Sequence, residues 1–127
     1  MARVTHRDPL IVVGSGIAGS LLALAAAEHG PVVLVTKDAL GEGSTARAQG
    51  GIAAAVDGHD SVEAHLADTL AAGAGLCDVG AAAHICREGP AQVATLLARG
   101  VRFDRSEGRL RLAREGAHSA ARAVHAG

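Results

Sequence analysis

The chain has almost no aromatic side chains. Its 127 residues include one Phe and neither Tyr nor Trp. Proteins that bind single-stranded nucleic acid stack the bases on aromatic rings, and a formal net charge of -1 gives no general attraction to a polyanion. We therefore expect no nucleic-acid partner, and we expect a core made of Ala, Val, Leu and Ile.

Cysteine is also scarce. Cys77 and Cys86 are the only two, and they form neither a Cys-x-x-Cys pair nor a Cys/His pattern typical of metal ligands. The seven His residues show no His-Glu-x-x-His pattern. The sequence thus predicts no metal site, and it favours two buried thiols in a reducing cytosol over a disulfide.

Long apolar runs are missing as well. None approaches the roughly 18 residues of a membrane-spanning helix, and the polar start at residues 1–8 has no feature of a signal peptide. We expect a cytoplasmic protein with no membrane partner. The remaining composition, 49% apolar and 20% charged, suits one modest domain with a packed core.

The most informative stretch that is present is a Gly-x-Gly-x-x-Gly motif. Residues 10–13 predict a strand buried on both faces, and residues 17–28 predict a helix. Between them, Gly14 makes the turn, Gly16 admits a phosphate to the backbone, and Gly19 lets the helix pack against the strand. The start of the helix is then expected to bind a pyrophosphate.

The end of the next expected strand bears on the ligand. Residues 32–36 complete a Rossmann-like βαβ unit, and an NAD site would place Asp or Glu at this strand tip to bind the ribose. The tip carries Thr36 and Lys37 instead, and Asp38 can serve only if the register shifts by two residues. Lys37 suits a 2′-phosphate or an adenine ribose. The residues disfavour NAD and leave FAD and NADP open.

A stretch rich in Gly, Ser and Thr follows at residues 41–51. Glycine pairs let a main chain lie against a flat ligand. Ser44 and Thr45 supply hydroxyls, and Gln49 supplies an amide. Taken alone, such a stretch is equally well a flexible surface loop.

Together, these segments resemble the flavoprotein family of succinate dehydrogenase, fumarate reductase and L-aspartate oxidase. Residues 14–19, 35–37 and 43–51 carry the family resemblance, and residues 68–78 and 114–119 resemble its oxidase branch. The resemblance implies an α/β fold in which residues 1–127 are the N-terminal part of an FAD-binding domain. It also implies that the capping domain and the main catalytic residues lie beyond Gly127, so we expect this chain alone to be inactive.

The resemblance implies FAD as a non-covalent cofactor. The dehydrogenase and reductase branches carry a His that bonds to the flavin, whereas this chain has Ser44 at the matching position, and serine cannot form that bond. The residues that the resemblance places against FAD are Gly14, Ser15, Gly16, Ile17, Ala18, Gly19, Lys37, Ser44, Thr45, Ala46, Arg47, Ala48, Gln49, Gly50 and Gly51.

The motif at residues 114–119 supplies the expected substrate contacts, Glu115 and His118. In the oxidase branch the Glu lies near the substrate, and a carboxylate that faces an α-ammonium group discriminates L-aspartate from succinate. The residues themselves support equally well that Glu115 is an ordinary loop carboxylate with no role in substrate binding. The family has Gly where this chain has Ala117; if that backbone needs a positive φ, Ala costs stability or shifts the loop and with it His118.

The activity that the resemblance implies is oxidation of L-aspartate to iminoaspartate, with oxygen or fumarate as the acceptor. The product would pass to quinolinate synthase in NAD biosynthesis. Two alternatives stay open, namely a succinate dehydrogenase or fumarate reductase relative and a truncated remnant without function. A plain NAD(P) dehydrogenase ranks below both, because it would not need residues 44–51.

The middle and end of the chain predict helices and short strands. A capping box with Asp60 as the cap predicts a helix that stops at residues 73–75. Asp78 is expected to cap a second helix, and Pro90 in a first turn predicts a third. Val93, Leu96 and Leu97 are expected on the inward face of this third helix. Residues 101–104 and 109–112 predict short strands of a hairpin or a meander.

Overall fold

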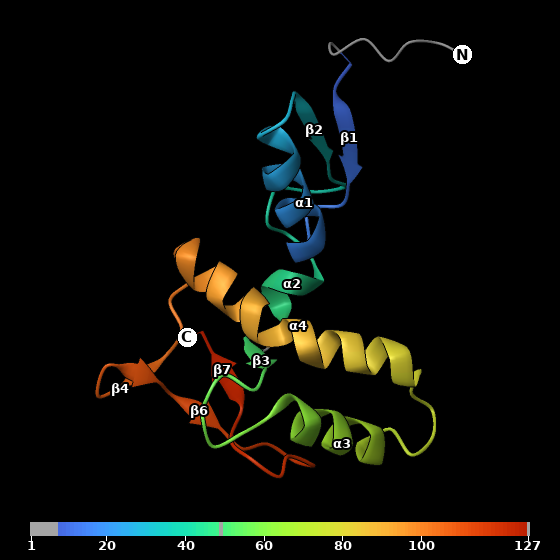
Figure 1. Cartoon of the computed structure of the whole chain (residues 1–127). Helices are drawn as coiled ribbons and strands as arrows, with labels where there is room; N and C mark the ends of the chain where they lie inside the picture. Colours follow the sequence, from blue (N-terminus) through green and yellow to red (C-terminus); the bar gives the residue numbers. More distant parts are fainter. Residues whose placement is uncertain (1–7, 49, 127) are drawn as a thin grey trace. The chain divides into compact units, whose positions relative to one another are not determined.

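A computed structural model describes residues 8–48 and 50–126 (Figure 1). The chain forms two compact units, Met1–Gln49 and Gly50–Gly127. Gln49, one of the expected FAD contacts, lies outside the described residues.

The first unit is the predicted βαβ unit. Strands β1 (Leu10–Val13) and β2 (Val32–Val35) pair in parallel, with Leu10 opposite Val32, and helix α1 (Ile17–Ala27) connects them. Parallel neighbours need such a crossover, because a tight turn cannot reverse the chain direction twice. A short helix, α2 (Ser44–Arg47), follows β2.

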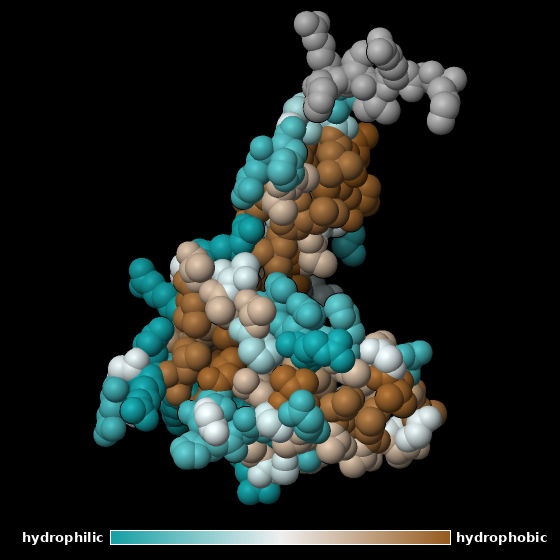
Figure 2. Space-filling view, in the orientation of Figure 1, coloured by the Kyte–Doolittle hydropathy of each residue, from teal (hydrophilic) through white to brown (hydrophobic). Residues whose placement is uncertain are grey.

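The prediction that β1 is buried on both faces is wrong. Val12 is only 5% exposed, whereas Ile11 and Val13 are 62% and 80% exposed. Neighbouring strand residues point to opposite faces, and α1 packs on the sheet. Because the sheet has only two strands in the part of the chain that the structure describes, the other face remains open, and apolar side chains gather there (Figure 2).

The second unit combines two helices with a small antiparallel sheet. Helices α3 (Val62–Ala72) and α4 (Val79–Ala98) pack against each other. The sheet has the order β3-β7-β6, and β4 and β5 form a separate hairpin. The strand bounds are Gly51–Ala53 for β3, Arg105–Ser106 for β4, Arg109–Leu110 for β5, Leu112–Ala113 for β6 and Ala123–His125 for β7.

The core of this unit lies between α4 and the sheet. Ala54, Val93, Phe103 and Val124 form its buried centre, and Leu96 and Leu97 pack against it as expected for the inward face of the helix. The predicted hairpin is present, but its first strand starts after residues 101–104, because Phe103 turns into the core. Both cysteines are free thiols; Cys86 is buried and Cys77 is partly buried.

Helix α4 is one helix where two were predicted. It runs for 20 residues from its cap, Asp78, and contains Pro90. Proline removes a helical hydrogen bond and usually ends a helix. Here a Cβ at Gly89 would lie 3.4 Å from the Cβ of Ala54, and Val93 is 1% exposed. Packing on the core on both sides of Pro90 holds the helix together, since tertiary contacts contribute more to helices than propensity does.

Asp60 does not cap α3, contrary to the prediction. Ser61 is the cap, and its Oγ accepts a hydrogen bond of 3.0 Å from the Ala64 N–H. The Asp60 carboxylate is bound by the guanidinium of Arg122, with Nε–Oδ2 and Nη2–Oδ1 distances of 2.9 Å. The pair directs the Asp60 carboxylate to a partner 62 residues away in the sequence, and the next residue, Ser61, takes the cap position.

Candidate functional site

The glycine turn between β1 and α1 has the geometry that the motif predicts. Gly14 has a φ of +106°, a conformation that L side chains rarely adopt. A Cβ at Gly19 would strike the carbonyl oxygen of Gly14, so only glycine lets α1 begin this close to β1. The Gly14 N–H donates to the Val35 carbonyl at 2.8 Å, which ties the turn to the end of β2.

The start of α1 lies beside this turn. Gly16 is the N-cap residue and contributes no side-chain cap. The Ile17 N–H donates to Thr45 Oγ1 at 3.2 Å, and the Ser15 hydroxyl donates to Thr36 Oγ1 at 2.9 Å. The first N–H groups of a helix have no partner within the helix, and with the helix dipole they attract an anion. The arrangement can bind a pyrophosphate.

A cavity of about 530 Å³ opens at this turn. It is lined by residues 13–16 of the turn, 35–37 at the end of β2 and 42–45 of the glycine-rich stretch. The volume is in the usual range of small-molecule sites, about 300–1,000 Å³. The fold therefore brings together three separate sequence segments that were predicted to share one ligand.

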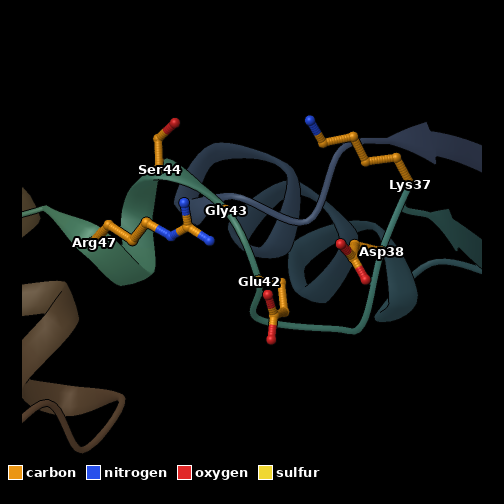
Figure 3. A pocket seen from close by; sticks show the side chains of 6 residues that line it. All are labelled: Lys37, Asp38, Glu42, Gly43, Ser44 and Arg47. Carbon is orange, nitrogen blue, oxygen red and sulfur yellow. The ribbon is translucent and has the colours of Figure 1, made fainter.

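A smaller charged cavity, of about 220 Å³, lies next along the same stretch (Figure 3). Lys37 and Arg47 contribute two cations, and Asp38 and Glu42 contribute two carboxylates. Asp38 Oδ1 accepts the Ala39 N–H at 2.9 Å, so part of that carboxylate serves a local turn. Glu42 lines both cavities. It was not predicted, because the glycines and hydroxyl groups of this stretch were the features that indicated a ligand.

The remaining predicted FAD contacts divide into two groups. The stretch expected to be a long loop contains helix α2, whose exposed Ser44 and Thr45 line the larger cavity, while Ala46 and Ala48 line neither of the two cavities. Gly50 and Gly51 belong to the second unit. Gly51 faces the ring of His125, since a Cβ there would lie 3.0 Å from its Cε1 atom.

The turn that carries Glu115 and His118 lies in the second unit, before β7. The His118 N–H donates to the Glu115 carbonyl at 3.2 Å, and Arg114 Nε donates to the His118 carbonyl at 2.7 Å. Glu115 Oε1 is 3.2 Å from Nε2 of His125, and both side chains are partly exposed. Sequence reasoning missed His125, which stands ten residues after Glu115 outside the motif.

Two histidine rings meet behind this turn. The centroids of His65 and His118 are 6.4 Å apart in an edge-to-face arrangement. The Nδ1 atoms of both rings are buried without a hydrogen-bond partner among the described residues. Burial, followed by the nearby charge of Arg122, lowers the pKa of His65, so this ring is neutral at pH 7.

A charged network joins the turn to α3. Asp68 Oδ2 accepts hydrogen bonds of 2.7 Å from the Ser119 N–H, the Ser119 hydroxyl and Nη1 of Arg122. Arg122 is completely buried and also holds Asp60. The hydrogen bonds from Ser119, and then Arg122, lower the pKa of Asp68 to about 2. The sequence did not predict this network, because its members are 51 to 62 residues apart.

This shift predicts an acid-dependent loss of stability. The pKa of Asp68 falls from its ordinary value of 3.8 to about 2 on folding. A lowered pKa in the folded state means a stabilising contribution that is complete above pH 3.8 and disappears as the pH falls to about 2. We expect Asp68→Asn to flatten the dependence of unfolding free energy on pH in this window, measured by denaturant titration at each pH. Asp57→Asn, at an exposed carboxylate, is the control; equal slopes in parent and Asp68→Asn would contradict the account.

Ala117 has a φ of +66°, the positive value for which a family glycine at this position is expected to be better suited. A left-handed backbone costs an L residue roughly 1–2 kcal/mol, while glycine loses more chain entropy on folding. We expect Ala117→Gly to raise the unfolding free energy by about 1 kcal/mol. The control is Ala120→Gly, at a residue without a positive φ, which we expect to destabilise. A loss of stability in both variants would show that the turn is relaxed at Ala117.

The fold and the site define a dinucleotide-binding protein: a parallel βαβ unit, a glycine turn that leads into a helix without a side-chain cap, and a cavity that three segments share. A comparison with family models is more specific. Residues 9–127 match the family described as FAD binding domain, and the chain belongs to this family. FAD is therefore its cofactor, and the NADP alternative falls away. The open turn and uncapped helix start fit the pyrophosphate of this group.

Curated relatives carry a common name. An L-aspartate oxidase of Streptomyces coelicolor is 52% identical over 120 residues, which cover 93% of this chain and 21% of the relative. A chloroplastic L-aspartate oxidase of Nicotiana tabacum, 2-b, is 49% identical over 124 residues, which cover 97% of this chain and 19% of the relative. The chain thus spans about a fifth of the length of these relatives.

Solved structures give the same fold. The Sdh1 complex of Mycobacterium smegmatis matches with a TM-score of 0.85 and 35% identity, over 94% of this chain and 21% of that one. A variant of the Escherichia coli quinol fumarate reductase FrdA matches with a TM-score of 0.84 and 30% identity, over 93% of this chain and 21% of that one. The predicted α/β FAD-binding fold and the family resemblance are confirmed.

The helices of the described part of the chain are too short or too polar to cross a membrane.

Proposed function

We propose that this chain is the N-terminal part of the FAD-binding domain of an L-aspartate oxidase. The whole enzyme would oxidise L-aspartate to iminoaspartate and pass the electrons to oxygen or fumarate. The observation that carries the proposal is the level of identity: 52% to an L-aspartate oxidase, against 35% and 30% to the structures of the dehydrogenase and reductase branches.

Binding of FAD is the role of the first unit in this proposal. When bound, FAD accepts the hydride of the substrate. The backbone N–H groups of Gly16 and Ala18 at the helix start would hold the pyrophosphate together with the N–H of Ile17, which donates to Thr45 Oγ1 here, and Lys37 would contact the adenine ribose. Ser44 and Thr45 would lie against the cofactor without a covalent bond, because a serine hydroxyl replaces the histidine that makes the bond in other branches. Gln49, Gly50 and Gly51 are proposed to continue this contact.

Substrate recognition is the role that we propose for Glu115 and His118. The Glu115 carboxylate would bind the α-ammonium group of L-aspartate, a group that succinate lacks. His125 of β7 contacts the same carboxylate at 3.2 Å. With succinate the Glu115 carboxylate would face no cation and would repel the carboxylates of the substrate, so a carboxylate at this place favours the amino acid over the plain dicarboxylate.

The rest of the catalytic apparatus would lie outside this chain, which spans about a fifth of its relatives. We place the capping domain and the main catalytic residues there. We also propose a cytoplasmic enzyme whose product passes to quinolinate synthase, because iminoaspartate hydrolyses in water and benefits from rapid use.

Two assays on the purified full-length gene product test the proposal. Acid precipitation should release the flavin into the supernatant, and L-aspartate should drive oxygen consumption or fumarate reduction. The isolated 127-residue chain is the control and should not turn over L-aspartate. Flavin that stays with the precipitated protein, together with turnover of succinate alone, would assign the protein to the dehydrogenase branch. Absence of flavin and of turnover would favour a remnant without function.

A further inference from the structure

Asp68 on α3 is the residue that fastens the Glu115 turn to the rest of the second unit. Its Oδ2 atom accepts both the N–H and the hydroxyl of Ser119, each at 2.7 Å. Ser119 directly follows His118 and ends the 114–119 motif. A backbone N–H and a side chain bound to one oxygen fix both the position and the direction of the chain at this point.

The two carboxylates of the network have different neighbours. Asp60 receives two hydrogen bonds of 2.9 Å from Arg122, and these are its side-chain bonds in the described residues. Asp68 receives one bond from Arg122 and two from Ser119. Asp60 therefore orients the buried guanidinium, whereas Asp68 connects α3 to the turn. The guanidinium also reaches the turn directly, because Nη2 of Arg122 donates to the Ser119 hydroxyl oxygen at 3.3 Å.

The turn needs such an anchor because its own conformation is strained. Ala117 has a φ of +66°, which glycine would adopt at lower cost. Inside the turn, the backbone is closed by the bond from the His118 N–H to the Glu115 carbonyl at 3.2 Å. The Glu115 side chain is partly exposed, and its 3.2 Å contact with His125 is also partly exposed, so this contact contributes little to holding the side chain. Without Asp68, the turn would relax and Glu115 would lose its position.

We propose that Asp68 is a positioning residue for substrate specificity: by holding Ser119 it fixes the turn that presents Glu115 to the α-ammonium group of an amino-acid substrate. This inference rests on the proposed oxidase function. It assigns to α3 a role that neither the glycine motif nor the 114–119 motif predicts.

The test compares Asp68→Asn with Asp60→Asn in the FAD-loaded full-length gene product. Each change removes one negative charge from the same arginine, so a merely structural role predicts similar effects. We expect Asp68→Asn to raise KM for L-aspartate by ~10-fold or more with kcat changed by less than ~3-fold, which is the pattern of lost binding. Asp60→Asn should leave KM within ~3-fold of the parent value. Ser119→Ala keeps the backbone N–H bond to Asp68 and removes the hydroxyl, which donates to Asp68 and accepts from Arg122. It should show a smaller rise in KM and serves if Asp68→Asn does not fold.

Hydrogen exchange separates this proposal from the proposed function. Without substrate, the amides of residues 115–119 should exchange faster in Asp68→Asn than in the parent or in Asp60→Asn. Unchanged exchange in Asp68→Asn, or equal rises of KM in the two Asn variants, would overturn the positioning role. If the parent does not oxidise L-aspartate, the proposed function fails and the specificity role fails with it, while faster exchange in Asp68→Asn alone still identifies the anchor.

Discussion

Gly19→Ala is expected to weaken FAD binding by ~10-fold or more. The added Cβ would strike the carbonyl oxygen of Gly14, and a backbone atom cannot rotate away as a side chain can. Overpacking of this kind costs about 1–3 kcal/mol, and each 1.4 kcal/mol is about a factor of ten in affinity. The start of α1 would move away from β1, and the donors of the turn would move with it. The dissociation constant of FAD can be measured by flavin fluorescence on the apoprotein.

Gly30→Ala is the matched control for this change. Gly30 lies in the same unit beyond the end of α1, and a Cβ there would meet no atom within 4 Å. We expect its affinity for FAD to stay within ~2-fold of the parent, because open space carries no steric cost. Equal affinities of all three proteins would show that the glycine turn does not bind the cofactor.

Arg122→Met is expected to cost the second unit about 3–5 kcal/mol of unfolding free energy, which is the usual effect of removing one partner from a buried ion pair. Arg122 is 0% exposed, and its removal leaves Asp60 buried without a counter-charge. Methionine keeps much of the side-chain volume, so the loss reports the charge and its hydrogen bonds rather than a cavity. The loss of unfolding free energy is measured by chemical denaturation of the full-length gene product. Hydrogen exchange of the α3 amides reports the unfolding of the second unit.

Arg111→Met controls for the loss of an arginine as such. Arg111 stands between β5 and β6 in the sequence, and its side chain is exposed. We expect a change below about 0.5 kcal/mol, as for other exposed positions. A similar small effect for Arg122→Met would mean that Asp60 and Asp68 find other partners and that the network does not stabilise the unit.

Local signals predicted the βαβ unit well. The apolar runs of β1 and β2 and the glycines between them depend on neighbours in sequence, and the structure has both strands and the helix where these signals placed them. The Asp78 cap and the inward face of α4 at Val93 have the same local origin. Apolar periodicity and capping residues predicted an element correctly where the contacts that determine it lie within a few residues of one another in the sequence.

The errors have long-range causes. Pro90 was expected to begin a helix, but packing against Ala54 carries α4 through it. Asp60 was expected to cap α3, but Arg122, 62 residues later, binds its carboxylate. The role of Asp68 was missed because Ser119 is 51 residues away in the sequence, and His125 was missed because it lies outside the 114–119 motif. The positive φ at Ala117, in contrast, could be considered from the sequence, because the family has a glycine at that position and glycine is typical of a positive φ.

The central claim is that this chain carries the FAD site of an enzyme that oxidises L-aspartate. The most direct test is the visible spectrum of the full-length gene product without oxygen, before and after addition of L-aspartate or, separately, of succinate. The account predicts a flavin band that L-aspartate bleaches and succinate does not. A band that bleaches only with succinate, or no flavin band at all, would contradict it.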